Sequence, residues 1–442
     1  MIIKGDKKVI RGWVMYDWAN SVYSLVISSA IFPIFYEAQT SSVYAKKVGL
    51  PSELIDSNDV TVDFFGYQVS PSVLYSLVIS ASFLIVSILS PILSGIADYT
   101  GNKKGFLKFF CYFGAFFCGT LFFFDANHME LSMLSVMFAS IGFWCSLVFY
   151  NAFLPEIAPL EEQDDISARG FIMGYIGSII LLIACLAMIM GIGPHLTKYS
   201  FILVGLWWVL FAQRTYRVIP SNPFKKKPEA DYIWKGFREL KIVYKEFMQT
   251  TRLKKFLYAF FFFNSGVQTV MLLATIFASK AIDWPEGDGG QGLIIAILLI
   301  QILAAVGAKL MSNISLKIGN ISTLKISVFI WIILCVGAYI ITKPFEFYIM
   351  AAGVGLVMGG IQAIARSTYS KYLPETTDHA SYFSFYDVSE KVGIVLGTAF
   401  FAFTEYYFDD IRYSVISIAG FFVIGLYYLF KVPKEETIIP AK

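Results

Sequence analysis

The sequence predicts an all-α membrane protein with twelve transmembrane helices in two parallel six-helix repeats, with both termini cytoplasmic. Its composition, its apolar segments and the placement of its basic residues support this prediction. Of the 442 residues, 57% are hydrophobic and only 15% are charged, whereas a soluble domain carries roughly 25% charged residues. The mean hydropathy is +0.65. These values exclude a soluble globular protein, a disordered chain and a small disulfide scaffold.

Twelve segments are free of Asp, Glu, Lys and Arg. A membrane-spanning helix needs about 20 mostly apolar residues, so the shorter segments must extend into their polar flanks. The segments are residues 18–36, 72–97, 109–124, 131–155, 170–197, 199–213, 256–279, 293–308, 326–342, 347–365, 392–404 and 413–430. The first helix should begin near Trp13 and contain Asp17. The eleventh should include the charged residues Asp387, Glu390 and Lys391.

Basic residues are placed asymmetrically along the chain. Most of the 35 Lys and Arg residues fall near the two termini, in the central stretch 214–255 and in alternate loops. Loops rich in Lys and Arg stay on the cytoplasmic side of a membrane. This pattern predicts that both termini and the central stretch are cytoplasmic.

The two halves of the chain resemble each other. Short matches occur in the same order in both: 94–102 (SGIADYTGN) with 312–320 (SNISLKIGN), 154–156 with 373–375 (both Leu-Pro-Glu), Gly174 with Gly393, and Asn20-Ser21 with Asn264-Ser265. Each match is short, but their shared order indicates an internal repeat. We therefore expect an N-terminal bundle at 1–219, a linker at 220–253 and a C-terminal bundle at 254–442. Parallel six-helix repeats are the architecture of major facilitator transporters.

The linker contains an amphipathic stretch at 233–247. Its apolar residues Trp234, Phe237, Leu240 and Tyr244 share one helical face. Such a helix is expected to lie at the membrane surface. Docking of a partner protein is the alternative.

The loop after the second predicted helix resembles the signature loop of major facilitator proteins. It contains Gly95, Asp98, Gly101, Lys103 and Lys104. Gly95 permits close helix packing, Gly101 permits a tight turn, and the lysines can meet anionic headgroups. Asp98 can pair with a cation or a helix N-terminus and so hold one conformation.

The second copy of this loop has Leu316 at the position of Asp98. We therefore expect an Asp-based latch in the first half only. The arginine-rich signature of many proton-driven antiporters is absent from 131–154, which argues against proton antiport.

Further stretches resemble a narrower family, the "unknown major facilitator" family that includes the fungal vacuolar amino-acid effluxers linked to autophagy. They are 12–21 (GWVMYDWANS), 149–156 (FYNAFLPE) with 174–177 (GYIG), and 362–367 (QAIARS) with 382–386 (YFSFY). Ser384 departs from the pattern, where Gly is expected. The resemblance implies a secondary transporter and, more weakly, amino-acid efflux.

Polar residues on the predicted helices are candidates for substrate binding, because polar groups in hydrocarbon are costly unless they face protein or water. One face of the first helix carries Asp17, Ser21, Ser24 and Ser28, and the seventh has a matching stripe. The resemblance implies that helices 1, 4, 7 and 10 line a central cavity. The substrate-binding candidates are Asn20, Tyr23, Ser24, Asn151, Asn264, Gln268 and Gln362. Hydrogen bonding between helices is the alternative for each.

Charged residues near or within the spans are candidates for gating or coupling. They are Asp17, Asp98, Lys103, Lys104, Arg366, Asp387, Glu390 and Lys391. Arg366 is expected to pair with an acid such as Asp17 or Glu156; otherwise it snorkels to the interface. Asp387 and Lys391 are spaced for a pair within one helix.

That pairing leaves Glu390 without an obvious local partner, so Glu390 is the first candidate for a titrating group. The expected function is a secondary active transporter that moves a small polar metabolite, an amino acid first, by alternating access. The alternatives are a sugar or drug carrier of the same fold, and a receptor or scaffold that does not transport.

An enzyme is not expected, because no nucleophile–base set is visible. The five cysteines lack CxxC spacing and the three histidines lie far apart, so no metal or other cofactor is expected. Any coupling ion should be a proton or sodium. The expected partners are a small-molecule substrate and the lipid bilayer, with no nucleic acid. We expect a monomer in the cell (inner) membrane.

Overall fold

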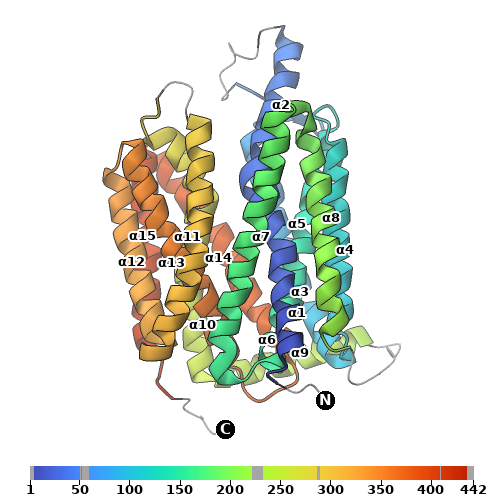
Figure 1. The fold of residues 1–442 in the computed structure, drawn as a ribbon, viewed down its shortest axis with the longest axis vertical. Helices are drawn as coiled ribbons and strands as arrows, with labels where there is room; N and C mark the ends of the chain where they lie inside the picture. The colour runs from blue at the N-terminus through green and yellow to red at the C-terminus, as the bar shows by residue number, and fades with distance from the viewer. Residues whose placement is uncertain are drawn as a thin grey trace.

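The structure is a computed structural model that describes residues 4–49, 51, 59–221, 232–285, 289–408 and 410–435. The first part of the predicted linker, 222–231, lies outside the described residues. Nearly all described residues are helical, and the helices form two bundles side by side (Figure 1).

The N-terminal bundle contains the first six membrane-spanning helices and a short β-hairpin. Its elements are α1 (Lys7–Val22), a π-helix η1 (Tyr23–Ala30), α2 (Ile31–Val48), β1 (Val62–Phe64), β2 (Tyr67–Val69), α3 (Pro71–Thr100), α4 (Lys103–Thr120), η3 (Leu121–Phe123), α5 (Met129–Asn151), α6 (Leu154–Ile157), η4 (Leu160–Glu162), α7 (Gln163–Gly191), η5 (Pro194–Leu196) and α8 (Thr197–Val218). The two strands are antiparallel. The elements α1, η1 and α2 together form the first span.

The second bundle follows the linker helix α9 (Tyr232–Gln249). It comprises α10 (Thr251–Ala281), α11 (Gly289–Ile318), α12 (Asn320–Ile340), α13 (Pro344–Lys371), α14 (His379–Phe408) and α15 (Ile411–Lys431). The start of α1, the end of α15 and α9 lie at one end of the molecule, which we call the α9 face. The β-hairpin marks the opposite end, the hairpin face.

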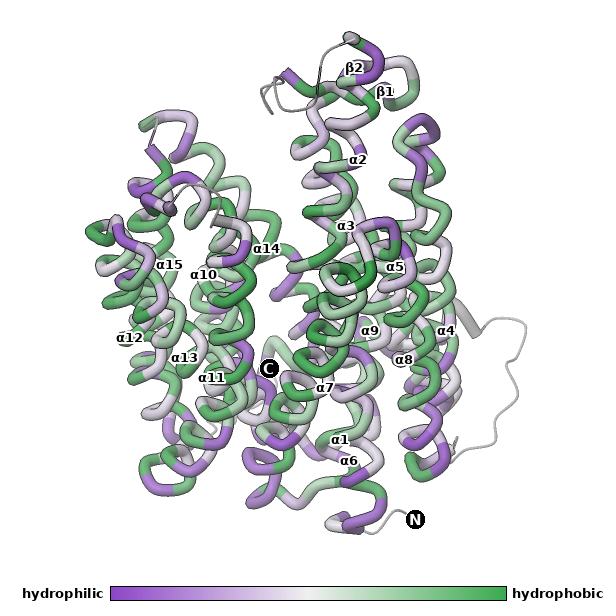
Figure 2. Tube along the Cα trace, turned by 45° about the horizontal axis from the view of Figure 1, so that its top comes forward, coloured by the Kyte–Doolittle hydropathy of each residue, from purple (hydrophilic) through white to green (hydrophobic). Residues whose placement is uncertain are grey.

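The predicted twelve-helix layout is confirmed. Among the described residues, eleven helices are long and apolar enough to cross a membrane. The remaining span, α14, has 30 residues but carries Asp387, Glu390 and Lys391, as the sequence predicts. Figure 2 shows hydrophobic residues along the middle of the helices and hydrophilic residues gathered near their ends.

The internal repeat is visible in equivalent helix contacts. A Cβ atom on Gly174 of α7 would lie 2.4 Å from the Ser21 hydroxyl of α1, and one on Gly393 of α14 would lie 2.4 Å from the Ser265 hydroxyl of α10. These are the glycines and serines that the two halves share in sequence. In each bundle, the fifth span therefore approaches the first so closely that a larger residue would require the serine side chain to move.

Small residues also bring α11 and α13 together in the C-terminal bundle. A Cβ atom on Gly359 would lie 2.0 Å from the carbonyl oxygen of Ala304, and one on Gly307 would lie 1.9 Å from that of Leu356. Because these neighbours are backbone atoms, a side chain can fit only if the helices move apart.

Replacing Gly359 with alanine should therefore destabilise the protein by about 1–3 kcal/mol, the usual effect of overpacking. Thermal unfolding of purified protein in detergent measures the change. Gly420→Ala is the matched control, because a Cβ atom there meets nothing within 4 Å. Equal melting temperatures for the two variants would contradict the close approach of α11 and α13.

Candidate functional site

A cavity between the bundles is lined by residues from both. Its volume is about 960 Å³, including its open mouth. The lining residues are Asp17, Asn20, Ser21, Ser24, Leu25, Phe143, Trp144, Leu147, Asn151, Phe171, Tyr175, Ser178, Asn264, Gln268, Met271, Gln301, Gln362, Arg366, Tyr386 and Glu390. Six of the seven predicted substrate-binding candidates are among them.

Tyr23 is the exception, and its placement corrects the prediction. Its side chain is 2% exposed and stacks on Phe143 with ring centroids 4.6 Å apart. It also lies beside Trp208, at 6.1 Å. Tyr23 therefore packs inside the N-terminal bundle and does not line the cavity.

The π-helix η1 changes which residues of the first span share a face. The Ser29 hydroxyl donates to the carbonyl oxygen of Ser24, five residues earlier, at 3.0 Å. Ordinary helical spacing predicts Ser28 below Ser24, but the wider π turn places Ser29 there. Ser29, not Ser28, lines the neighbouring pocket described below.

Two equivalent asparagines present unpaired donors beside the cavity. The side-chain NH₂ groups of Asn20 and Asn264 are buried and have no hydrogen-bond partner within the described structure. The two residues match in the internal repeat, so one comes from each bundle. The side-chain oxygen of Gln301 is also buried and unpaired. Buried polar groups without partners are rare and costly, so these three suit a polar ligand.

Arg366 lies in a cage of polar and aromatic groups at the α9-face end of the cavity. Its side chain is 4% exposed and its Nη2 atom is 3.2 Å from the carboxylate of Asp17. The guanidinium also donates to the Ser167 hydroxyl and carbonyl oxygens, each at 2.9 Å. It donates to the side-chain oxygen of Asn151 at 3.3 Å. Arg366 therefore does not snorkel to the interface.

Aromatic rings complete this cage. The Arg366 guanidinium carbon lies 4.2 Å from the ring centroid of Phe171 and 5.0 Å from that of Trp13. The Tyr150 hydroxyl donates to Asp17 at 2.8 Å. Because Asp17 and Arg366 belong to different bundles, this buried pair joins the bundles through charge.

A second group of charges lies on α14. Lys391 is fully buried and lies 2.9 Å from Asp387, which is the predicted intrahelical pair. Its Nζ atom also lies 3.7 Å from the ring centroid of Trp144 in the other bundle. The Ser90 hydroxyl donates to Asp387 at 3.1 Å, again across the bundles.

Glu390 belongs to the same group, which corrects the prediction that it lacks a local partner. Its carboxylate lies 2.7 Å from Lys391 Nζ and accepts a hydrogen bond from Gln268 at 2.9 Å. Two carboxylates thus share one lysine, and Glu390 is the one that lines the cavity. The group has one more negative than positive charge when both acids are ionised.

Asp98 contacts both a cation and a helix N-terminus, the two kinds of partner that the sequence suggested. Its carboxylate accepts from the backbone N–H groups of Ala380 and Ser381, at 3.3 and 2.7 Å. These groups open α14, so Asp98 caps a helix of the other bundle. Lys103 Nζ is 3.8 Å from Asp98 and contacts Glu156.

Glu156 extends this contact, because His379 Nδ1 of the other bundle is 3.1 Å from its carboxylate. Lys104 has a different place from its neighbour. It donates to the carbonyl oxygen of Ile219 at 3.0 Å and to the Ser221 hydroxyl at 3.3 Å. Lys104 thus ties α4 to the end of α8 within one bundle.

A related contact forms at the second copy of the loop, although that copy has no acid of its own; as at Asp98, the acid comes from the first half of the chain. Asp164 of α7 is 1% exposed and accepts from Asn320 at 2.7 Å and from Ser315 at 3.2 Å. Lys371 Nζ lies 2.6 Å from it. Here the acid is at the start of the fifth span and the donors are on the loop. At Asp98 the acid is on the loop and the donors are at the start of the eleventh span, α14.

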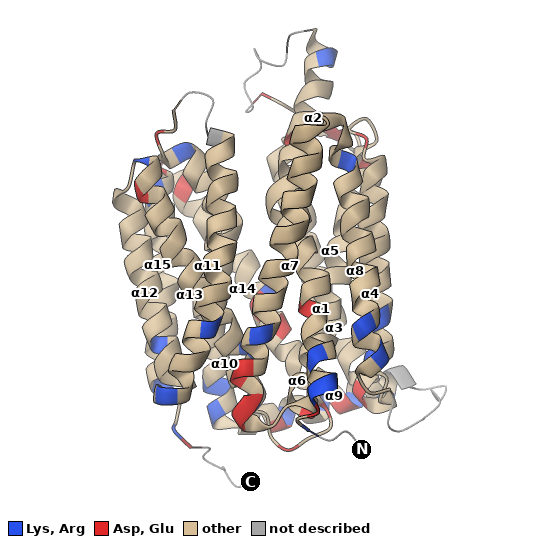
Figure 3. Ribbon diagram, in the orientation of Figure 1, with Lys and Arg blue, Asp and Glu red and all other residues tan. Residues whose placement is uncertain are grey.

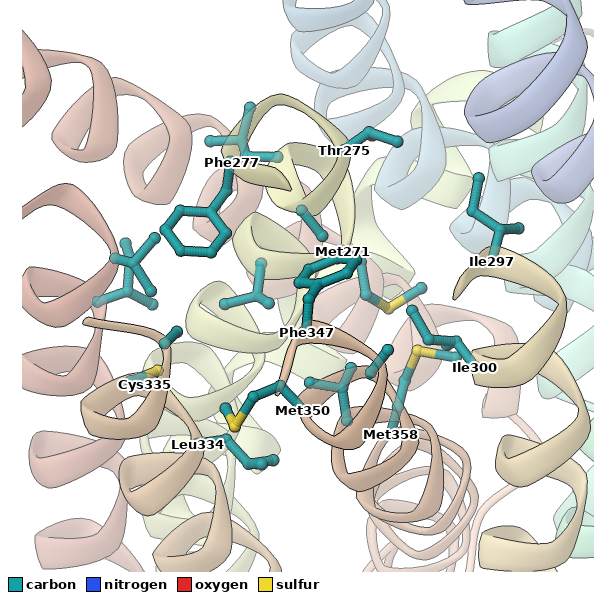
Figure 4. Close-up of a pocket in the computed structure, with 18 of the residues that line it drawn as sticks. Met271, Thr275, Phe277, Ile297, Ile300, Leu334, Cys335, Phe347, Met350 and Met358 are labelled. Carbon is teal, nitrogen blue, oxygen red and sulfur yellow. The ribbon is translucent and has the colours of Figure 1, made fainter. Parts of the chain in front are cut away.

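An apolar pocket adjoins the polar cavity within the C-terminal bundle. It has a volume of about 1120 Å³, including open space, and is lined mainly by α10 to α15. Figure 4 shows Met271, Met350, Met358 and Phe347 among its lining side chains. Leu25, Met271 and Gln301 line both spaces, so the two are neighbours.

Sequence reasoning missed several members of the site on α7. Ser167 holds Arg366, and the Tyr175 hydroxyl donates to Gln362 at 2.9 Å. A signal was available, because Ser167, Phe171, Tyr175 and Ser178 fall on one helical face. Asp164 gave no such signal, since it lies among other acids at the start of the helix.

Solved structures establish the fold. The chain superposes on the fucose:proton symporter of E. coli with a TM-score of 0.67, over 97% of this chain and 98% of that chain, at 12% identity. A bacterial homologue of the iron transporter ferroportin gives 0.64, over 97% and 99%, at 11% identity. At these identities the likeness shows the fold, which is the major facilitator fold.

The family follows from sequence comparison. The family described as "Vacuole effluxer Atg22 like" matches residues 5–441, and the chain belongs to it. An uncharacterized MFS-type transporter of Bacillus subtilis (strain 168) is 32% identical over 447 residues, covering 99% of this chain and 97% of the relative. The autophagy-related protein 22 of Coccidioides immitis is 22% identical, covering 89% and 81%. The chain is thus a secondary transporter of the major facilitator superfamily.

Removing the carboxylate of Asp17 should lower the free energy of unfolding, because Arg366 is then a buried charge without its partner. In Asp17→Asn the guanidinium of Arg366 stays buried without its carboxylate, and we expect a loss of stability of about 3–5 kcal/mol. The double variant Asp17→Asn/Arg366→Gln should lose less than the sum of the two single changes. Thermal unfolding measures all three.

Asp165→Asn is the control, because Asp165 pairs with Arg169 and Lys309 nearer the surface. That variant should change stability by about 0–1 kcal/mol. Additive effects at Asp17 and Arg366 would show that the two charges are not coupled.

Proposed function

We propose that the protein transports a small zwitterionic metabolite, an amino acid first, through the cavity between its bundles by alternating access. The observation that carries this proposal is the set of unpaired groups beside the cavity. Asn20 and Asn264 offer N–H donors that suit a carboxylate, while the unpaired oxygen of Gln301 is an acceptor that suits an ammonium group. Glu390 is already paired with Lys391 and adds negative charge on the same side of the site. A zwitterion supplies both partners.

The apolar pocket supports the same reading. It lies beside these polar groups and shares Leu25, Met271 and Gln301 with the cavity. A ligand with a charged head and an apolar side chain would fill both spaces. The family description, with its word effluxer, also favours export.

Alternating access is supported by where the bundles touch. The contacts of Asp98, Asp164 and Arg366 cross between the bundles and gather toward the α9 face. The described conformation is therefore closed at that end. Transport requires these contacts to break while the bundles rock about the cavity.

The α9 face is proposed to be cytoplasmic, in the cell (inner) membrane. Figure 3 shows Lys and Arg concentrated toward the end of the molecule that carries α9. Because basic segments remain on the cytoplasmic side, this distribution supports an orientation with the closed end inside and the cavity mouth outside.

The substrate proposal predicts the effect of removing one donor. Asn264→Ala should raise the half-saturation concentration for the amino acid roughly tenfold or more, since a hydrogen bond to a charged group contributes about 1.5–3 kcal/mol. Asn313→Ala is the control, because Asn313 is exposed at the far end of α11. Uptake into liposomes after a thermal-shift screen of amino acids, sugars and nucleosides gives the values.

A response to sugars alone would favour a sugar carrier. Absence of flux for every solute class would favour a receptor or scaffold, and an unchanged half-saturation concentration in Asn264→Ala would remove Asn264 from the site.

Coupling to a proton is proposed to act through Glu390. It lines the cavity and shares Lys391 with Asp387, so adding a proton to it removes the excess negative charge. Glu390→Gln should abolish the dependence of net flux on a pH gradient while exchange between the two sides persists. Flux that keeps its pH dependence in this variant, or that follows a sodium gradient instead, would contradict this role.

A further inference from the structure

The linker helix α9 lies across the junction between the two bundles at the α9 face. It packs against α3, where a Cβ atom on Gly95 would lie 2.4 Å from the carbonyl oxygen of Gly236, and one on Gly236 would lie 2.7 Å from Ile96. The two backbones therefore touch. Val243 is fully buried on the same side of α9.

The same helix also contacts α14 of the other bundle. The ring of Phe385 lies 5.4 Å from that of Phe247 and 6.0 Å from that of Tyr244. The Tyr382 hydroxyl donates to the carboxylate of Glu246 at 3.3 Å. Since α3 and α14 belong to different bundles, α9 acts as a strap between them.

The outer side of this strap is aromatic and basic. Trp234 is 69% exposed and Phe237 44%, and their rings lie 6.2 Å apart. Lys241 and Lys245 are exposed as well. At 3.6 residues per turn, both lysines lie on the side of α9 opposite Gly236 and Val243.

This combination of groups fits one surface. Exposed aromatic rings gain by leaving water, and Trp and Tyr favour the boundary between headgroups and acyl chains. Lysines beside them attract anionic headgroups. Gly95 and Ile96 lie within the last two turns of the spanning helix α3, so α9 lies at the level where that helix leaves the bilayer.

We propose that α9 is a strap bound to anionic lipid, which holds the bundles together at the α9 face and so links lipid composition to transport. Opening that face must separate α14 from α3. With its outer side held by lipid, α9 resists this separation. Anionic lipid therefore slows opening at the α9 face.

A fluorescent label on Met248→Cys tests the lipid contact in the full chain. Met248 is exposed on α9 and the five native cysteines are buried, so the added thiol reacts selectively. The protein is placed in nanodiscs of phosphatidylcholine with increasing phosphatidylglycerol, and quenching by spin-labelled lipid is recorded. We expect quenching to rise with phosphatidylglycerol.

Lys241→Gln and Lys245→Gln should each weaken this preference for anionic lipid about fivefold. Lys431→Gln is the matched control, an exposed lysine at the end of α15, and it should leave the preference unchanged. Equal quenching in both lipids, equal effects of all three variants, or protection of the label only by an added protein would overturn the proposal.

A second assay measures the effect of anionic lipid on the transport rate. Liposomes with phosphatidylglycerol should transport more slowly than liposomes of phosphatidylcholine alone, and the double variant Lys241→Gln/Lys245→Gln should lose this difference. If the variant keeps the full lipid dependence, α9 does not transmit it. The quenching assay needs no substrate, so it can fail or succeed independently of the proposed amino-acid transport.

Discussion

The buried pair of Asp17 and Arg366 is the contact on which the described conformation depends. Each residue comes from a different bundle, and both are almost inaccessible to water. A single charge left in this place would be strongly unfavourable, since its partner supplies most of the compensation. Tyr150 and Ser167 complete the hydrogen bonds that a buried pair requires. The pair also lines the cavity, so the proposed substrate would compete directly with a contact that joins the bundles.

Two further contacts between the bundles follow the internal repeat. Asp98 caps the start of α14, and Asp164 meets the second copy of the same loop. The repeat thus places one carboxylate contact on each side of the pseudo-twofold axis, and in both contacts the acid belongs to the N-terminal bundle. Glycine contacts such as Gly174 with Ser21 pack the helices closely within each bundle. The bundles meet both through polar contacts such as that of Asp164 and through an apolar cluster of Ala168, Ala308 and Ala363.

The sequence predicted the twelve helices, the repeat and most of the cavity, because hydrophobicity and periodicity act locally. It failed where contacts depend on packing between distant segments. Tyr23 turned inward because an aromatic stack was available, and the π-helix moved Ser29 into the position predicted for Ser28. Glu390 found Gln268 on another helix, which spacing within α14 cannot reveal. The contact of Asp164 could not be predicted for the same reason, since its partners lie in the other half of the chain.

The central claim is that the Asp17–Arg366 pair holds the α9 face closed. Spin labels at Lys8→Cys and Lys317→Cys report on that face, and labels at His195→Cys and Lys343→Cys report on the hairpin face; all four positions are exposed. Distances measured by electron spin resonance in the background of Asp17→Asn test the claim. The account predicts a longer distance at the α9 face together with a shorter distance at the hairpin face. Distances unchanged from those of the parent protein at both faces would contradict it.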